Sequence, residues 1–231
     1  MKKNKKILIV AAHPDDEILG CGGTIIKHVL NGDEVHVLIM AEGLTSRDVR
    51  RDVSLRNKEL SQLYANTYQA AKIMGVKSLK ICDFPDNRMD GVELLDVVKK
   101  VEEMVETIKP DMVYTHHAGD VNVDHTVTHN AVITACRPLP GQTVKTILFF
   151  ETLSSTEWQI GTCDKIFMAN WFVDIEATFA KKMEALKCYD SEMREYPHSR
   201  SYESVEILAK YRGTVIGCQF AEAFSLGRLI S

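Results

Sequence analysis

The sequence lacks the features that mark several common protein classes. It contains no basic block or stripe and carries a formal net charge of -4, so we expect no binding to nucleic acid. No apolar run is long enough to span a bilayer, and the basic opening at residues 1–6 lacks the length and cleavage site of a signal peptide. These absences predict a cytoplasmic protein without membrane insertion.

The cysteines form none of the motifs that bind metal or exchange disulfides. There are six of them, and none forms a C-x-x-C pair, so neither a zinc ribbon nor a thioredoxin-like site is indicated. Most lie in apolar contexts, where buried free thiols are typical, and we expect a reducing compartment. The six are Cys21, Cys82, Cys136, Cys163, Cys188 and Cys218.

The chain does have length and an alternating pattern. Its 231 residues fit one domain over 1–231 that can bury its core without a structural metal, so a bound metal would be catalytic. Apolar runs predict buried parallel strands, and helical patterns fill the gaps between them, which favours a parallel sheet with right-handed crossovers. The predicted strands are 7–12, 34–40, 78–84 and 111–115, and the predicted helices are 17–30, 54–74, 91–108 and 123–136.

The second half of the chain is less regular. Segments 145–152 and 171–175 resemble strands, and 177–189 and 201–211 resemble helices, the latter ending near Gly213. No internal repeat or linker divides the chain.

Polar side chains crowd together where the first predicted strand ends. His13, Asp15, Asp16 and Glu17 fall within five residues, and such crowding raises the energy of each ionised carboxylate unless a cation binds. Imidazole with carboxylate suits zinc, which in catalytic sites usually keeps three protein ligands and one open position. The spacing lets His13 and Asp16 reach one metal from a turn, which leaves Asp15 as a base for the water.

The fourth predicted strand ends in a second polar loop, which would supply the third ligand. Because the carboxyl ends of parallel strands meet at one edge of a sheet, this loop can face the first. His125 is the best candidate, since it lies near the start of a helix that fixes its direction. His129 follows one turn later, but residue 126 is Thr rather than the glutamate of a metalloprotease helix, so we interpret His129 as structural.

Two other interpretations compete with a metal site. Asp15 or Asp16 could simply cap the helix that follows. Gly20-Cys21-Gly22-Gly23 suggests a dinucleotide fingerprint, but Ile25 breaks its spacing and the acidic loop would repel a pyrophosphate. We expect these glycines to let a helix pack closely beneath the site.

The chain resembles the LmbE-like superfamily, the relatives of GlcNAc-phosphatidylinositol de-N-acetylase (PIG-L). The first signature matches Ala12-His13-Pro14-Asp15-Asp16-Glu17 with Gly20-Cys21-Gly22-Gly23-Thr24, and the second matches Asn122-x-Asp124-His125. Segments 83–87, 137–138 and 197–203 also resemble stretches of bacterial members. The resemblance implies a Rossmann-like α/β fold, an open, mostly parallel sheet with helices on both faces. It also implies a mononuclear zinc hydrolase of N-acetylglucosaminyl conjugates.

The resemblance assigns roles by position. The zinc ligands would be His13, Asp16 and His125, with Asp15 as general base, Asp124 as the acid that orients nearby imidazoles or the base, and Arg56 as a substrate contact.

One position departs from the pattern of several relatives. They carry a histidine three residues before the last ligand, where this chain has Asn122. Asparagine can donate a hydrogen bond to an oxyanion but cannot deliver a proton at neutral pH. The leaving amine would then be protonated by Asp15 or by another histidine. The candidates are His198, which we favour, His117 and His116.

The sequence leaves the substrate open. Arg47, Arg56 and Arg200 could bind phosphate or sugar hydroxyls, and we predict a GlcNAc-type or nucleotide-linked amino-sugar conjugate as the small-molecule partner. One Zn²⁺ per chain is expected, although another divalent metal would suit the same ligands. The alternatives are a metal-dependent amidase or esterase acting on a non-sugar substrate and a non-catalytic metal- or sugar-binding protein. Homo-oligomers occur among similar proteins, but no residue here demonstrates one.

Overall fold

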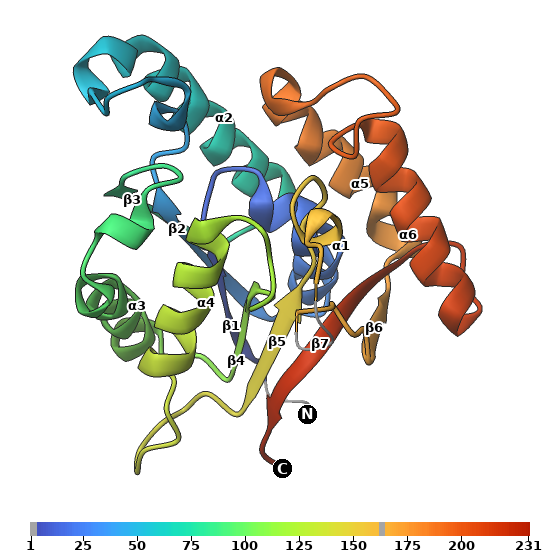
Figure 1. Cartoon of the computed structure of the whole chain (residues 1–231). Helices are drawn as coiled ribbons and strands as arrows, with labels where there is room; N and C mark the ends of the chain where they lie inside the picture. Colours follow the sequence, from blue (N-terminus) through green and yellow to red (C-terminus); the bar gives the residue numbers. More distant parts are fainter. Residues whose placement is uncertain (1–3, 162–164) are drawn as a thin grey trace.

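The computed structural model describes residues 4–161 and 165–231, which form a seven-stranded sheet in the order β3-β2-β1-β4-β5-β7-β6 (Figure 1). The first five strands pair in parallel, whereas β7 runs antiparallel to both β5 and β6, so the predicted mostly parallel sheet is confirmed. The strands are β1 (Lys6–Ala11), β2 (Glu34–Ala41), β3 (Ser78–Phe84), β4 (Met112–His116), β5 (Thr146–Phe150), β6 (Trp171–Asp174) and β7 (Ala221–Leu229).

Helices cover both faces of this sheet, as predicted. In β1 the side chains alternate, so that Ile7 and Ile9 join a core beneath α1, α2 and α5, while Leu8 and Val10 join a second core beneath α3 and α4. The helices are α1 (Asp16–Leu30), α2 (Asn57–Met74), α3 (Leu94–Ile108), α4 (Val123–Ala135), α5 (Glu176–Leu186) and α6 (Tyr202–Ile216). Short 3-10 helices are η1 (Thr45–Arg47), η2 (Val53–Arg56), η3 (Met89–Gly91), η4 (Thr156–Trp158) and η5 (Lys187–Glu192).

The C-terminal third departs most from the sequence prediction. The helix expected to end near Gly213 continues to Ile216 and ends at Gly217, which adopts the left-handed conformation with φ 77°. Gly213 instead lies inside α6, where an added Cβ would meet the backbone oxygen of Gln219 at 2.8 Å. The final strand, β7, was not predicted, because its small and charged residues give weak strand propensity.

Helix α1 changes direction at Cys21, whose φ is -151°. The predicted close packing of its glycines is confirmed, since a Cβ at Gly23 would lie 2.8 Å from Cδ1 of Ile175. After the kink, the N–H groups of Gly23 and Thr24 donate to the buried Glu222 carboxylate of β7 at 2.9 and 2.7 Å. Nζ of buried Lys182 lies 2.7 Å from the same carboxylate, which compensates its charge.

Several remaining sequence predictions concern single groups. Cys21, Cys82 and Cys136 are buried free thiols, whereas Cys188 and Cys218 are half-buried. Cys163 and residues 1–3 lie outside the described residues. Within the described ranges, every helix is too short or too polar to pass through a lipid bilayer.

Candidate active site

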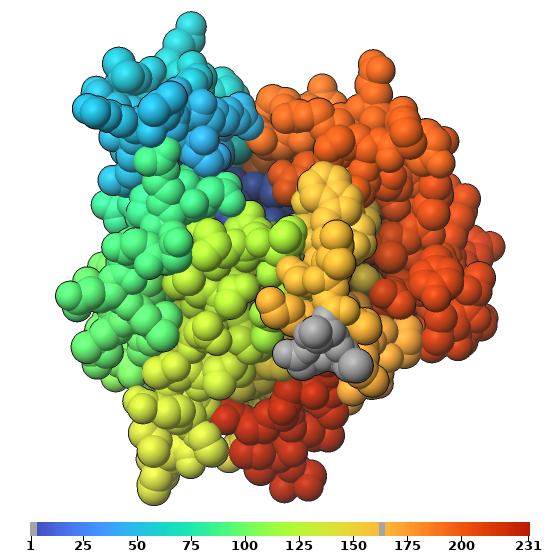
Figure 2. Space-filling model, in the orientation of Figure 1, coloured from blue at the N-terminus to red at the C-terminus, as the bar shows by residue number. Residues whose placement is uncertain are grey.

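The candidate site lies at the carboxyl ends of β1 and β4, where the strand order reverses direction. The chain runs from β1 outward to β2 and β3, then returns to place β4 on the other side of β1. Open parallel sheets bind ligands in the crevice that such a reversal leaves. Figure 2 shows a hollow here, floored by dark blue atoms from the start of the chain and bordered by blue, green, yellow and orange segments from later in it.

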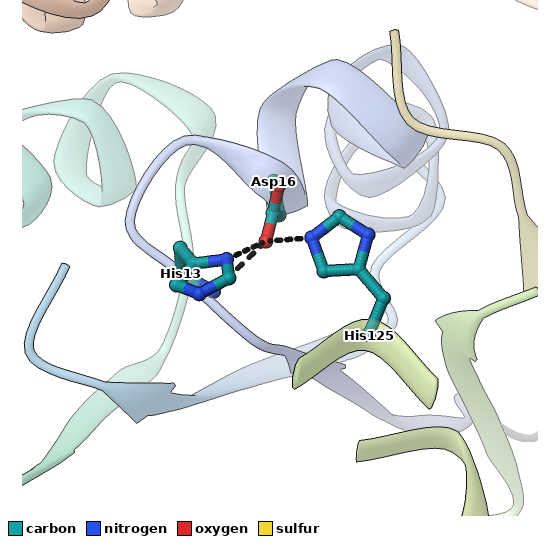
Figure 3. Close-up of side chains that lie close together, drawn as sticks. All are labelled: His13, Asp16 and His125. Atoms are coloured by element: carbon teal, nitrogen blue, oxygen red, sulfur yellow. Dashed lines mark hydrogen bonds and ion pairs between the residues drawn. The ribbon is translucent and has the colours of Figure 1, made fainter. Parts of the chain in front are cut away.

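Three side chains predicted as metal ligands converge in this crevice (Figure 3). The Oδ2 atom of Asp16 lies 3.1 Å from Nδ1 of His13 and 3.2 Å from Nε2 of His125. His13 and Asp16 come from the β1–α1 loop, and His125 comes from the first turn of α4. All three are mostly buried, and their ligand atoms lie within 4.8 Å of one another, which is close enough for one ion.

A carboxylate fixes the outer nitrogen of His13. Its Nε2 lies 3.0 Å from Oδ2 of Asp124, and that carboxylate also accepts the N–H groups of Asn87 and Met89 at 2.6 and 2.9 Å. Two backbone donors keep Asp124 an acceptor, so Nε2 of His13 carries a proton, and Nδ1 is the nitrogen that a metal would bind in place of a proton. Such carboxylate–histidine pairs are the usual outer support of metal sites.

His125 has its own carboxylate partner, Asp120, which the sequence analysis left without a role. Nδ1 of His125 lies 3.1 Å from Oδ2 of Asp120, so its Nε2 is turned toward Asp16. Asp120 also accepts the Thr156 hydroxyl at 2.7 Å, the Ser155 hydroxyl and the backbone N–H of Asn122 at 2.9 Å. In the sequence, Asp120 lies between His117 and Asn122, in the same polar segment as the predicted ligand His125, and this position could have indicated a role beside that ligand.

Two neighbouring groups are poorer metal ligands. Nε2 of His116 accepts the backbone N–H of Ala12 at 2.8 Å, which occupies that nitrogen. The His116 ring stacks on His125 at a centroid distance of 3.8 Å, and burial together with the nearby His125 lowers its pKa well below the usual value. Asp86 lies 3.3 Å from Nε2 of His13, but it accepts the N–H and hydroxyl of Ser46 at 3.1 and 2.6 Å.

Asp15 stands at the start of α1 but does not cap it. Its side chain makes no capping hydrogen bond; instead Oδ2 pairs with Nη1 of Arg200 at 3.0 Å. Burial raises the pKa of Asp15 to about 7, against the opposing charge of Arg200. Its Oδ1 is buried without a hydrogen-bond partner among the described groups. The carboxylate therefore presents one free oxygen and can exchange a proton near neutral pH.

The electrostatics of the site indicate a cation. Burial lowers the pKa of His13, but the carboxylates of Asp124 and Asp16 outweigh it and hold that pKa well above its usual value. Burial also opposes the charged form of His125, yet Asp16 and Asp120 raise its pKa to about 9. The pKa of Asp16 is held well below its usual value, because the nearby His125 and His116 outweigh the effect of burial. The surrounding carboxylates thus favour a positive charge on the two histidines, and a bound metal ion could supply that charge in place of the protons.

Buried polar atoms test whether a metal fits these residues. Within the described part of the chain, Oδ1 of Asp16 and Nε2 of His125 are buried without hydrogen-bond partners. Unpaired buried polar atoms are costly, and Nε2 of His125 is turned toward Oδ2 of Asp16, where an ion between the ligands would lie (Figure 3). Two imidazoles and a carboxylate form a typical donor set for catalytic zinc, so the residues fit such an ion.

The three predicted substrate arginines lie in different environments. Arg200 reaches the site, where it also donates to Oγ of Ser154 at 2.9 Å. Arg47 makes a two-pronged pair with Glu192 at 2.9 and 2.7 Å and remains 46% exposed. Arg56 pairs with Asp48 at 2.7 and 2.9 Å, which ties it to its own loop.

The candidates for the acid role are also differently placed. Asn122 caps α4 by accepting the N–H of Asp124 at 2.9 Å, and its amide donates to Asn87. Nε2 of His117 lies 3.0 Å from the carbonyl oxygen of Lys165. His198 is exposed on the loop that carries Arg200, and its Nδ1 accepts the backbone N–H of that arginine at 3.0 Å. His129, interpreted as structural, bonds the His116 carbonyl at 2.9 Å.

Comparison with known proteins identifies the family. A family model described as GlcNAc-PI de-N-acetylase, PIG-L, matches residues 8–136. The chain belongs to the PIG-L family. Among PIG-L relatives, the uncharacterized deacetylase YaiS of Escherichia coli strain K12 is 30% identical over 197 residues, which span 82% of this chain and 92% of the relative.

Solved structures share the fold of this PIG-L protein. The N,N'-diacetylchitobiose deacetylase of Pyrococcus horikoshii superposes with a TM-score of 0.78 at 21% identity, covering 98% of this chain and 85% of the other. The 4-carboxy-2-hydroxymuconate hydratase GalB of Pseudomonas putida superposes with a TM-score of 0.77 at 21% identity, covering 98% of both chains. Because the same fold serves a deacetylase and a hydratase, the site has to decide the chemistry.

Proposed function

We propose that this chain is a zinc-dependent hydrolase, acting as one domain with one ion per chain, that removes the N-acetyl group from an amino-sugar conjugate. The observation that carries the proposal is the buried trio His13, Asp16 and His125 beside Asp15, whose carboxyl group has a pKa of about 7 and one oxygen without a hydrogen-bond partner. The de-N-acetylase description of the family and the deacetylases among its relatives support the same reaction class.

A zinc ion held by Nδ1 of His13, the Asp16 carboxylate and Nε2 of His125 would polarise the acetamide carbonyl and acidify water. The outer carboxylates prepare both imidazoles for this, since Asp124 and Asp120 each hold the proton on the far ring nitrogen.

Asp15 is the proposed base. Its Oδ1 accepts a proton from the attacking water, while Arg200 holds Oδ2 and fixes the direction of the free oxygen. The Arg200 charge also favours the ionised carboxylate against the effect of burial. A group that is half-protonated near neutral pH can accept this proton and later return it.

The leaving nitrogen then needs a proton. Asp15 holds the one taken from water and can deliver it, so that water and amide become acetate and a free amine. His198 remains the alternative donor, because its Nε2 is free of the backbone bond that occupies Nδ1. Asn122 is a weaker candidate for the oxyanion, since its carbonyl and its amide already bond Asp124 and Asn87.

The test is release of acetate and free amine from N-acetylglucosamine, N,N'-diacetylchitobiose and nucleotide-linked N-acetyl sugars by the zinc-loaded protein. We expect Asp15→Asn to keep its zinc and lose activity by about 100-fold or more, the range of general-base catalysis. Asp96→Asn, on the exposed side of α3, is the matched control and should keep full activity. A zinc-loaded, fully active Asp15→Asn enzyme would contradict the assigned base.

The rival functions give different products in the same assays. A hydratase would consume a carbon–carbon double bond and release no acetate, whereas an esterase or amidase of non-sugar substrates would cleave acyl esters or acyl peptides but spare the sugars. A binding protein would take up zinc and turn over nothing. Acetate released from the amino sugars alone distinguishes the proposed function from all three.

A further inference from the structure

The backbone of Asp15 is held in a conformation that residues with a Cβ avoid. Its φ is 99° and its ψ is -28°, in the left-handed region. Such a backbone persists only where surrounding contacts hold it, and it is enriched at active sites. Asp15 is 1% exposed, so those contacts come from the protein itself.

Hydrogen bonds fix both peptide groups that flank Asp15. On its amino side, the N–H of Asp15 donates to Oε2 of Glu17 at 3.0 Å. On its carboxyl side, the carbonyl of Asp15 accepts the N–H groups of Ile18 and Leu19 at 3.0 and 2.9 Å, in the first turn of α1. Because the two dihedrals of a residue describe how its flanking peptide planes are turned, fixing both planes fixes the left-handed conformation.

Glu17 is itself held from a distant part of the chain. Its Oε1 accepts the hydroxyl of Tyr189 at 2.8 Å, and Tyr189 comes from η5, 172 residues later. Glu17 is 2% exposed and Tyr189 is fully buried, so the contact is shielded from water. The position of Asp15 therefore depends on a buried chain of two hydrogen bonds.

This arrangement reverses the usual roles at a helix start. An aspartate at the N-cap normally turns its carboxylate back to accept an N–H of the first turn. Here the Asp15 carboxylate makes no such bond and points to Arg200, while Glu17 reaches back to the N-cap amide, as the acid of a capping box does. The capping hydrogen bond at this helix start is therefore made by the Glu17 side chain, and the Asp15 carboxylate remains available to the site.

We propose that Glu17, held by Tyr189, is a positioning residue that clamps the Asp15 backbone and thereby aims the Asp15 carboxylate into the site. The proposal rests on the proposed function only in taking Asp15 as the base. It differs from a purely structural cap in predicting a loss of turnover rather than a loss of stability alone.

Variants at Glu17 separate the two roles. Glu17→Met removes both acceptor oxygens, and we expect kcat for acetate release to fall by about 100-fold, the effect of misplacing a reacting group by about 1 Å. KM and the zinc content should stay within about two-fold of wild type. Glu17→Gln should recover most of kcat, because its carbonyl can accept the Asp15 N–H while its amide donates to the Tyr189 oxygen.

Tyr189 provides a second, milder test with a matched control. Tyr189→Phe removes the hydroxyl that holds Glu17 and should lower kcat several-fold with an unchanged KM. Tyr114→Phe deletes the hydroxyl of another buried tyrosine, bonded to His28 in a different part of the core, and should keep the wild-type kcat. If Glu17→Met does not fold, Tyr189→Phe decides, and a wild-type kcat in that variant overturns the proposal.

Crystal structures of zinc-loaded wild type and of the Glu17→Met or Tyr189→Phe variant provide a readout that needs no substrate. We expect Asp15 to leave the left-handed region in the Glu17→Met protein and the Asp15–Arg200 contact to lengthen in either variant. An unchanged Asp15, or a lowered melting temperature with a wild-type kcat, shows that Glu17 is only a cap. A wild-type protein that releases no acetate contradicts the proposed function, while the Asp15 geometry still decides the clamp.

Discussion

Asp120 offers a sharp test of how the metal ligands are oriented. Each of its two oxygens accepts two donors: the Thr156 hydroxyl and Nδ1–H of His125 on one, and the Ser155 hydroxyl and the Asn122 N–H on the other. An asparagine at this position keeps the shape but replaces one oxygen with an NH₂ group. In either orientation the NH₂ group would face another hydrogen-bond donor of fixed direction, either the Asn122 N–H or Nδ1–H of His125.

The structure sets the size of the expected effect. If the NH₂ faces the Asn122 N–H, a buried donor is left unpaired, at a cost of about 1–3 kcal/mol. If it faces His125, it favours the tautomer that carries the proton on Nε2, the nitrogen that would bind the metal. Loss of such an outer partner typically weakens metal binding about 10- to 100-fold, or about 1.4–2.7 kcal/mol.

The assay is a competition titration of zinc against a chelator at fixed pH. We expect the zinc Kd of Asp120→Asn to rise about 10- to 100-fold. Asp111→Asn is the control, since Asp111 is also an acceptor of a backbone N–H, that of Lys6, but lies at the opposite end of β4. A zinc Kd for Asp120→Asn equal to that of the control would refute the orienting role.

Three further outcomes follow from the site and its support. Arg200→Met removes the charge that lowers the pKa of Asp15, so that pKa should rise by about 1–3 units. The acid limb of the pH profile of kcat/KM should then move to higher pH, and an unchanged profile would contradict the pairing. The pKa values of both ligand histidines are raised, that of His125 to about 9, so zinc must displace a proton from each. The zinc affinity should therefore rise with pH, approaching about 100-fold per pH unit for two protons, and an affinity independent of pH would contradict this. Gly23→Ala places a Cβ 2.8 Å from Ile175 and should lower the free energy of unfolding by about 1–3 kcal/mol. Gly91→Ala, whose Cβ would meet nothing within 4 Å, is the control and should leave the melting temperature nearly unchanged, so equal melting temperatures for the two variants would contradict the prediction.

The sequence predicted the parts of this molecule that local pattern determines. The alternation of apolar runs and helices indicated the parallel half of the sheet, and strand ends indicated that the loops with His13 and His125 would meet. Their roles as zinc ligands stay predictions, although the geometry agrees with them.

What the sequence did not predict depends on contacts between distant residues. The pairing of Arg200 with Asp15 joins residues 185 positions apart, and no spacing rule indicates it. Asp120 in the β4–α4 loop and Asp124 in the first turn of α4 lie four residues apart, and only the three-dimensional structure shows that each serves a different histidine. Strand β7 escaped detection because its place beside β5 is decided by tertiary packing rather than by its own propensity.

The kink in α1 has a consequence for the order in which the protein matures. The second half of this first helix is capped by Glu222 of β7, which lies 199 residues after Gly23 in the chain. While the chain is being made, the Gly23 and Thr24 amides have no such acceptor, and Lys182 has no buried counter-charge. We therefore expect α1, together with the preceding loop that carries His13, to settle only after β7 has been synthesised and has joined the sheet. A nascent chain that still lacks β7 would then not retain zinc at His13 and Asp16.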